Sequence, residues 1–255
     1  MTGTCVVTGG SRGIGRAVAV EMASAGRAVA VGFVSNPAAA ESVVTLIKDG
    51  GGRAEAFQCD ISREEDVVAL FDAATRQLGP VNALVANAGI AHAGYCARFT
   101  AAELGRLFQV NVVGTMLCCR EAVRRMGRRH AGAGGSIVAI SSFAATMGGR
   151  KAVTAYAASK AAVDVFVTGL AREVASDGIR VNVVRPGVTV TDMTDGLHDE
   201  AGASAELARA IPLGRPAEPA EIAKAIGFLM SVDARYITGA HLDVSGGGFH
   251  FSQQS

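Results

Sequence analysis

The sequence predicts an α/β protein built on one doubly wound parallel sheet of about seven strands, with helices on both faces in a Rossmann-type arrangement. Short β-rich runs alternate along the chain with long alanine-rich helical stretches, a pattern typical of parallel sheets with crossover helices. The runs are apolar throughout and do not alternate with polar residues, as expected for strands buried on both faces. A glycine-rich stretch follows the first run, where a strand would meet its helix.

The elements follow one another in strict alternation. The expected strands are 4–8, 28–34, 54–59, 82–87, 136–141, 179–184 and 240–244. The expected helices are 13–25, 38–49, 63–78, 101–129, 152–176 and 218–231. Right-handed crossovers between parallel strands then leave few topologies open.

No linker rich in proline, glycine or serine divides the 255 residues, so one domain is expected over 1–255. The connection from Thr191 to Pro212 is polar and much longer than an ordinary strand-to-helix loop. It leaves the carboxyl end of a strand, which is where open α/β sheets bind ligands. We therefore predict a substrate lid over 191–212, with a surface excursion of no function as the alternative.

The composition argues against several classes of partner. A formal net charge of +1 gives no bulk attraction to nucleic acid or to a membrane surface. The five cysteines form no C-x-x-C pair, and the five histidines show no metal-binding spacing, so no metal is expected. With no transmembrane run and no basic or apolar leader, we expect a cytoplasmic protein.

The stretch VVTGGSRGIGRAV, residues 6–18, predicts an anion site. Its spacing is T-G-x-x-x-G-x-G, formed by Thr8, Gly9, Gly13 and Gly15. Small residues let a pyrophosphate approach the backbone, and the helix N-terminus offers free N–H groups and a partial positive charge. A tight turn alone would need only one glycine, so a nucleotide site is the favoured interpretation.

Two features of the sequence favour NADP(H) over NAD(H). NAD sites usually place a carboxylate after the second strand to bind the ribose 2′-OH, but residues 33–36 are Phe, Val, Ser and Asn. Arg12 lies inside the glycine loop, where a guanidinium would pair with a 2′-phosphate. A solvated loop cation is the alternative for Arg12.

Tyr156 and Lys160 lie four residues apart in a strongly helical stretch, so their side chains share one helix face. A free phenol has a pKa of about 10, and a nearby ammonium would lower it. Such a pair suits proton transfer at an alcohol or ketone oxygen. The alternative is a core tyrosine with a lysine that extends past it to solvent.

These motifs, taken together, resemble the single-domain branch of the short-chain dehydrogenase/reductase family over nearly the whole chain. The matching segments, in chain order, are TGGSRGIG, CDIS, ANAG with Ala86 in place of the first asparagine, QVNVVGT, ISSFAA, YAASK and RPGVTVTDM. The resemblance implies a catalytic set of Asn111, Ser142, Tyr156 and Lys160. Ser142 is preferred over Ser141, although it lies one residue further from the tyrosine than in many members.

The resemblance also implies the residues that contact the cofactor. They are Thr8, Gly9, Ser11, Arg12, Gly13, Ile14, Gly15, Ser35, Asn36, Asp60, Ile61, Asn87, Ala88, Gly89, Tyr156, Lys160, Pro186, Gly187, Thr189 and Thr191. In the implied mechanism Tyr156 is the general acid in reduction and the base in oxidation. Lys160 lowers the pKa of the tyrosine and holds the nicotinamide ribose, Ser142 polarises the carbonyl, and Asn111 supports a water in the proton relay.

The expected activity is therefore that of an NADP(H)-dependent carbonyl reductase or secondary alcohol dehydrogenase acting on a small molecule. Related patterns occur in 3-oxoacyl-carrier-protein reductases and in glucose 1-dehydrogenase-like enzymes, which leaves 3-oxoacyl thioesters and sugars or polyols as substrate classes. An acyl carrier could dock on the basic run 120–130, but a solvated helix end is favoured, and Asp177 replaces a basic residue frequent in carrier reductases. A non-catalytic NADP(H)-binding sensor or scaffold is the alternative class. Family members pair their two longest helices, which implies a homotetramer or homodimer.

Overall fold

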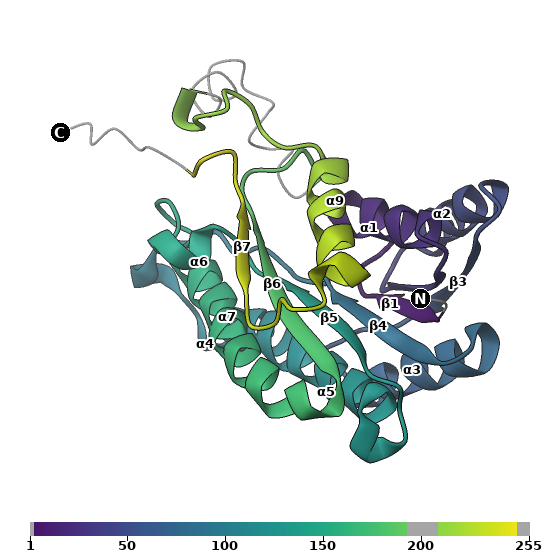
Figure 1. The fold of residues 1–255 in the computed structure, drawn as a ribbon. Helices are drawn as coiled ribbons and strands as arrows, with labels where there is room; N and C mark the ends of the chain where they lie inside the picture. The colour runs from purple at the N-terminus through teal and green to yellow at the C-terminus, as the bar shows by residue number, and fades with distance from the viewer. Residues whose placement is uncertain (1–2, 193–208, 249–255) are drawn as a thin grey trace.

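The chain forms a seven-stranded parallel sheet with the strand order β3-β2-β1-β4-β5-β6-β7, seen here in a computed structural model (Figure 1). The structure describes residues 3–192 and 209–248. The strand order reverses between β1 and β4, and this switch point is where ligands bind in open α/β sheets. The predicted fold class is confirmed.

The strands lie within a few residues of their predicted positions. They are β1 Thr4–Val7, β2 Ala28–Phe33, β3 Arg53–Gln58, β4 Val81–Ala86, β5 Gly135–Ile140, β6 Ile179–Pro186 and β7 His241–Val244. The main helices are α1 Gly13–Ser24, α2 Pro37–Asp49, α3 Glu64–Leu78, α4 Ala101–Phe108, α5 Thr115–Met126, α6 Ala144–Met147, α7 Thr154–Val174 and α9 Pro219–Met230.

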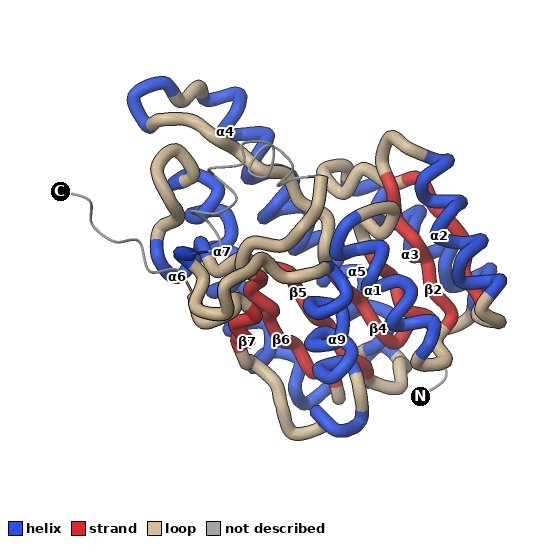
Figure 2. The backbone as a smooth tube through the Cα atoms, turned by 90° about the horizontal axis from the view of Figure 1, so that it is seen from above, coloured by secondary structure: helices blue, strands red, loops and turns tan. Residues whose placement is uncertain are grey.

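Two apolar layers enclose the sheet. Helices α1, α2 and α9 cover one face, and α3, α5 and α7 cover the other (Figure 1). The four residues of β1 are all buried, because this strand lies at the centre of the sheet, between β2 and β4. Viewed from above, the strands run in order across the molecule between the two helical layers (Figure 2). Within the described residues, no helix is long and apolar enough to cross a membrane.

The predicted continuous helix over 101–129 is wrong. The structure divides it into α4, a π-helical turn over Gln109–Gly114, and α5. The turn places Asn111 in the interior, where its side chain bonds the backbone of Ile90 on a separate segment. Single π-turns inside α-helices are frequent at functional sites. The helix periodicity of the sequence contains no sign of this turn.

The predicted lid over 191–212 lies mostly outside the described residues. Its two ends are held together on the scaffold, because Thr189 and Ala217 form an isolated parallel bridge. The amide of Val190 donates to the carbonyl of Ala217, and the amide of Ala217 donates to the carbonyl of Val188, both at 2.9 Å. The segment between these ends therefore starts and finishes at one place above the sheet.

Adding a methyl group at Gly114 should destabilise the π-turn. A Cβ there would lie 2.8 Å from the Ile61 side chain and carbonyl, so Gly114→Ala should lower the free energy of unfolding by about 1–3 kcal/mol. The control is Gly105→Ala in α4, where no atom lies within 4 Å of the new Cβ and a gain of up to about 1 kcal/mol is expected. Urea denaturation measures both; equal effects would contradict the tight packing described here.

Candidate active site

The glycine loop between β1 and α1 is shaped by close backbone contacts. Gly9 and Gly13 have φ values of +63° and +52°, in the region that favours glycine. A Cβ on Gly15 would lie 2.1 Å from the carbonyl oxygen of Gly9, so no other residue fits without moving the loop. Arg12 at the helix N-cap makes no side-chain capping bond, and the first turn of α1 carries no acidic residue. The first-turn amides therefore suit an anionic group.

Asn87 ties this loop to the end of β4. Its side-chain amide donates to the carbonyls of Thr8 and Gly9 at 2.9 and 3.1 Å. The Thr8 hydroxyl accepts in return from the amides of Asn87 and Ala88, both at 3.0 Å. These four bonds fix the two central strands to each other at the switch point of the sheet.

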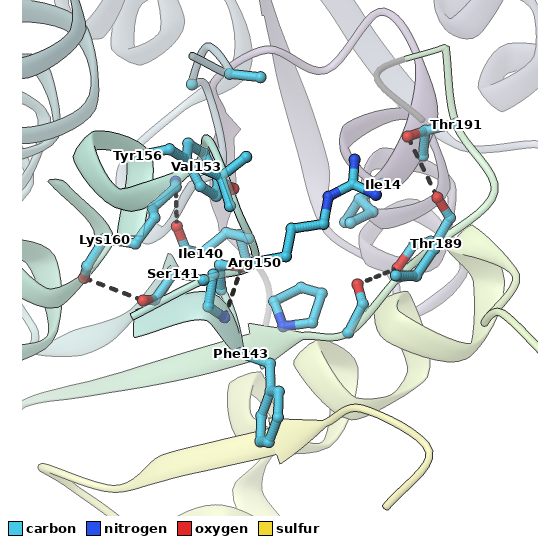
Figure 3. Close-up of a pocket in the computed structure, with 18 of the residues that line it drawn as sticks. Ile14, Ile140, Ser141, Phe143, Arg150, Val153, Tyr156, Lys160, Thr189 and Thr191 are labelled. Atoms are coloured by element: carbon cyan, nitrogen blue, oxygen red, sulfur yellow. Dashed lines mark hydrogen bonds between the residues drawn. The ribbon is translucent and has the colours of Figure 1, made fainter. Parts of the chain in front are cut away.

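A cavity of about 550 Å³ opens beside this loop, within the size range of small-molecule sites (Figure 3). It brings together ten residues that the sequence singled out: Ile14, Asn87, Gly89, Ser142, Tyr156, Lys160, Pro186, Gly187, Thr189 and Thr191. They come from the first turn of α1, from the ends of β4, β5 and β6, and from α7. The cavity thus brings together part of the predicted set; predicted residues that do not line it include Thr8, Gly9, Gly13, Gly15, Ala88 and Asn111.

Two adjacent serines at the end of β5 have different roles. The Ser142 hydroxyl accepts from the amide of Ala144 at 3.2 Å, and its hydrogen-bonding influence on Tyr156 acts to lower the pKa of the phenol. Ser141 is buried and donates to the backbone carbonyl of Lys160 at 3.1 Å. The geometry therefore supports Ser142 as the serine that faces the reacting group and Ser141 as a structural residue.

Burial of the Tyr156 phenol outweighs its bond to Ser142, so the pKa of Tyr156 is raised above its ordinary value. This direction is opposite to the expected lowering by Lys160. The Lys160 ammonium lies 5.9 Å from the centroid of the Tyr156 ring and donates to the carbonyl of Ile140 at 2.8 Å. It thus stands over the ring without bonding the phenol oxygen.

Lys160 is buried, which lowers its pKa to about 8, while the negative charge of Asp164 opposes this shift. Asp164 lies one helix turn further along α7 and is itself bonded by Arg185 at 2.8 Å. The second Asp164 oxygen is buried without a partner among the described residues. Arg185 also contacts a ring nitrogen of His241 on β7 at 2.6 Å. The charge of Lys160 is therefore coupled, through Asp164 and Arg185, to the edge strand of the sheet.

Asn111 is fully buried, and its side chain fixes the backbone of Ile90, in the segment that follows β4. Its side-chain oxygen accepts from the amide of Ile90 at 2.8 Å, and its amide donates to the Ile90 carbonyl and the Ser159 hydroxyl, both at 3.0 Å. A Cβ on Gly89 would lie 3.2 Å from the Asn111 oxygen and 3.3 Å from the Lys160 ammonium. Asn111 and Lys160 thus converge on Gly89, although no bond joins them directly.

Several predicted cofactor residues lie away from this cavity and already have partners in the chain. Asn36 caps α2 by accepting from the amide of Ala39 at 2.9 Å. Asp60 accepts from Ser62 and from Arg106. Burial raises the pKa of the Asp60 carboxyl, but those bonds outweigh it and leave the pKa below its ordinary value.

Ile61 packs in the core beneath α5 and presents no polar group. Ser11, Arg12 and Ser35 do not line the cavity. Arg12 pairs with Asp192 at 3.1 Å, and both side chains are mostly exposed. Among the described residues, no group of three or more His, Cys, Asp or Glu is placed to hold a metal ion.

Comparisons with known proteins show the family to which the chain belongs. The family described as enoyl-(acyl carrier protein) reductase matches residues 9–250. A short-chain type dehydrogenase/reductase from Mycobacterium marinum has a similar structure, with a TM-score of 0.89 and 33% identity over 96% of this chain and 94% of its own. The chain belongs to the short-chain dehydrogenase/reductase family.

Other members of the family are closer in sequence. An uncharacterized oxidoreductase of Escherichia coli is 45% identical over 95% of this chain and 98% of its own. A human 3-oxoacyl-[acyl-carrier-protein] reductase is 41% identical over 97% and 98%. A blue fluorescent protein from a metagenomic library, solved in complex with NADPH, has a TM-score of 0.87 and 38% identity over 96% of each chain. This member of the family is accordingly an oxidoreductase.

Sequence reasoning missed the residues that form the wall opposite the cofactor loop of this short-chain dehydrogenase/reductase. His92, Phe143, Met147, Arg150 and Val153 all line the cavity. Four of them belong to the connection between Ser142 and Tyr156, which the sequence analysis treated only as spacing. The signal that could have found this wall is Arg150, an arginine that directly follows a pair of glycines between two catalytic residues.

Replacing the two serines should separate their roles. Ser142→Ala should raise the pKa of Tyr156 further, because the bond that lowers it is lost, whereas Ser141→Ala should leave it unchanged. The chain has three tyrosines and no tryptophan, so a pH titration followed by tyrosinate absorbance measures these pKa values. The part of the titration curve that disappears in Tyr156→Phe belongs to Tyr156. A shift in Ser141→Ala as large as in Ser142→Ala would contradict the assignment.

Proposed function

We propose that this protein is an NADP(H)-dependent carbonyl reductase or secondary alcohol dehydrogenase in which Tyr156 is the general acid and base. The observation that carries the proposal is the cavity that Ser142 and Tyr156 both line, together with Ile14 at the start of α1. Lys160 stands over the tyrosine ring in the same cavity. These groups are the ones that proton transfer to a carbonyl oxygen requires.

The glycine loop fits a nicotinamide dinucleotide. The missing side chain of Gly15 lets the carbonyl of Gly9 approach the start of α1, and the uncapped N-terminus of that helix provides the donors that a pyrophosphate needs. Gly187 lines the cavity at the end of β6, where a Cβ would lie 2.8 Å from Ser245, so the backbone there is close-packed beside the position proposed for the nicotinamide. Thr189 and Thr191 add polar groups to the same wall.

Three observations support NADP(H) as the preferred cofactor. No carboxylate occupies residues 33–36 after β2, and Arg12 is a cation in the glycine loop. The relative from the metagenomic library was solved with NADPH. Because Arg12 pairs with Asp192 across an exposed contact, a 2′-phosphate would have to compete only with a weak surface ion pair.

Ser142, Tyr156 and Lys160 each have a separate role in the proposed reaction. A bound reduced nicotinamide supplies a hydride to the carbonyl carbon. Ser142 donates a hydrogen bond to the carbonyl oxygen, and Tyr156 delivers the proton that makes it a hydroxyl. The raised pKa keeps Tyr156 protonated at neutral pH, as an acid must be, and the Lys160 ammonium stabilises the phenolate that remains.

Small ketones and 3-oxoacyl thioesters are the proposed substrates, supported by the relatives named 3-oxoacyl-[acyl-carrier-protein] reductases. Docking of the carrier protein itself is not supported by the basic run 120–130. Arg120, Arg124 and Arg125 all bond the buried carboxylate of Glu121. Asp177 is likewise buried and pairs with Arg129. These charges are largely neutralised within the chain.

A sugar or polyol substrate is less well supported. Sugars are bound by several polar groups, yet most residues that line the cavity are apolar or glycine, and none is a carboxylate. The proposed assembly is a homo-oligomer, as in the family resemblance.

The first test follows NADPH and NADH consumption in parallel with ketones and 3-oxoacyl thioesters. Tyr156→Phe should lose turnover by at least about 100-fold, the usual contribution of a general acid, while NADPH binding is retained. Unchanged turnover would exclude Tyr156 as the acid. NADPH binding without turnover of ketones, thioesters, sugars or alcohols would instead favour a sensor.

Reduction should also lose rate above about pH 8, where the buried Lys160 releases its proton. In Asp164→Asn the charge that raises the pKa of Lys160 is gone, so the pKa falls and the loss of rate begins at a lower pH. The pH profile of kcat/KM measures this shift. A profile that moves to higher pH, or stays in place, would contradict the link between Asp164 and Lys160.

A further inference from the structure

Arg150 extends across the cavity from the connection between α6 and α7 (Figure 3). Gly148 and Gly149, each with a φ of +78°, turn the backbone just before it. The connection begins next to Ser142 and leads directly into the helix that carries Tyr156. The backbone of Arg150 therefore lies on the wall that carries Ser142 and Tyr156, and its side chain extends from there toward Ile14 at the start of α1 (Figure 3).

The Arg150 guanidinium makes no hydrogen bond or ion pair with any residue in 3–192 or 209–248. The other arginines in these ranges without such a partner do not line this cavity; they are Arg16, Arg76, Arg98, Arg128, Arg172, Arg209 and Arg235. A guanidinium carries five N–H donors in a planar fork that matches a carboxylate. Arg150 thus presents its donors to whatever enters the cavity.

The other polar groups of the cavity wall point to an anion as well. Of the 22 described residues that line it, none is Asp or Glu, and the two formal charges are those of Lys160 and Arg150. Lys160 is already bonded to the Ile140 carbonyl and stands over Tyr156. His92 lines the same cavity, and its Nδ1 atom is buried without a partner in the described chain. One cation and one imidazole therefore remain for a ligand.

We propose that the substrate carries a carboxylate, so that the enzyme reduces oxo acids or oxidises the corresponding hydroxy acids, with Arg150 as the residue that selects them. This inference rests on the proposed function and names its substrate class. The ketone oxygen lies at Ser142 and Tyr156, and the carboxylate pairs with the guanidinium of Arg150. His92 supplies a further hydrogen bond to the acid.

The remaining wall suits the carbon chain between these two groups. Phe143, Met147 and Val153 are apolar and line the cavity on the same connection as Arg150. In reduction the ketone oxygen gains a proton from Tyr156, and a bound reduced nicotinamide would supply the hydride to the ketone carbon. The carboxylate keeps its charge throughout, so its pairing with Arg150 contributes to binding equally before and after the reaction.

The experiment compares three oxo acids with their methyl esters: 2-oxobutanoate, acetoacetate and 4-oxopentanoate. Wild type should prefer one acid over its ester. Arg150→Gln should raise KM for that acid about 10- to 100-fold, the effect of losing a charge-assisted hydrogen bond, and leave the ester unchanged. Arg150→Lys should restore only part of the loss, because an ammonium lacks the planar fork. Lys151→Gln, an exposed neighbour outside the cavity, is the matched control and should have no effect.

Three outcomes would overturn the proposal. Equal losses for acid and ester would make Arg150 a structural residue, and a higher KM for NADPH alone would assign it to the cofactor phosphates. Turnover of esters but not acids would leave the carbonyl reductase in place and reject the acid substrate. Calorimetric binding of the preferred acid in the presence of NADP⁺ separates the two proposals. Binding that Arg150→Gln abolishes, without any turnover, would support the carboxylate site and reject the proposed reaction.

Discussion

The close approach of the backbone at the start of α1 is the constraint on which the site depends. The carbonyl of Gly9 occupies the space where any side chain at position 15 would lie, and Asn87 bonds the same carbonyl from the next strand. The helix therefore begins directly above the switch point of the sheet, with its free amides at the cavity edge. In the proposed reaction, the groups at the end of β5 and on α7 act together with a cofactor whose position this loop would fix.

A second constraint is electrostatic. Lys160 is buried among apolar neighbours, and burial acts against its charge. Asp164 compensates in part, and Arg185 in turn compensates Asp164, so the charge in the cavity is balanced by a chain of pairs that ends at β7. Removal of a charge at the edge of the sheet would thus change the electrostatic environment of Lys160.

The fold could be predicted almost completely from the sequence, because central parallel strands are apolar throughout and the glycine spacing marks the first crossover. The catalytic candidates followed from their order along the chain. The π-turn could not be predicted, since it depends on the bonds of Asn111 to Ile90, a contact between separate segments. Nor could the orientation of Arg150, which two left-handed glycines turn into the cavity. Both features arise from tertiary contacts and backbone angles, which hydrophobic periodicity does not encode.

The bridge between Thr189 and Ala217 has a consequence for how such enzymes diversify. A loop whose two ends are already joined adds little conformational cost when it lengthens, about 0.6 kcal/mol for each doubling. Insertions, deletions and transplanted segments between these ends can therefore accumulate without loss of the scaffold. In engineering terms, this position is an exchange point, at which a foreign segment can be joined to an unaltered sheet.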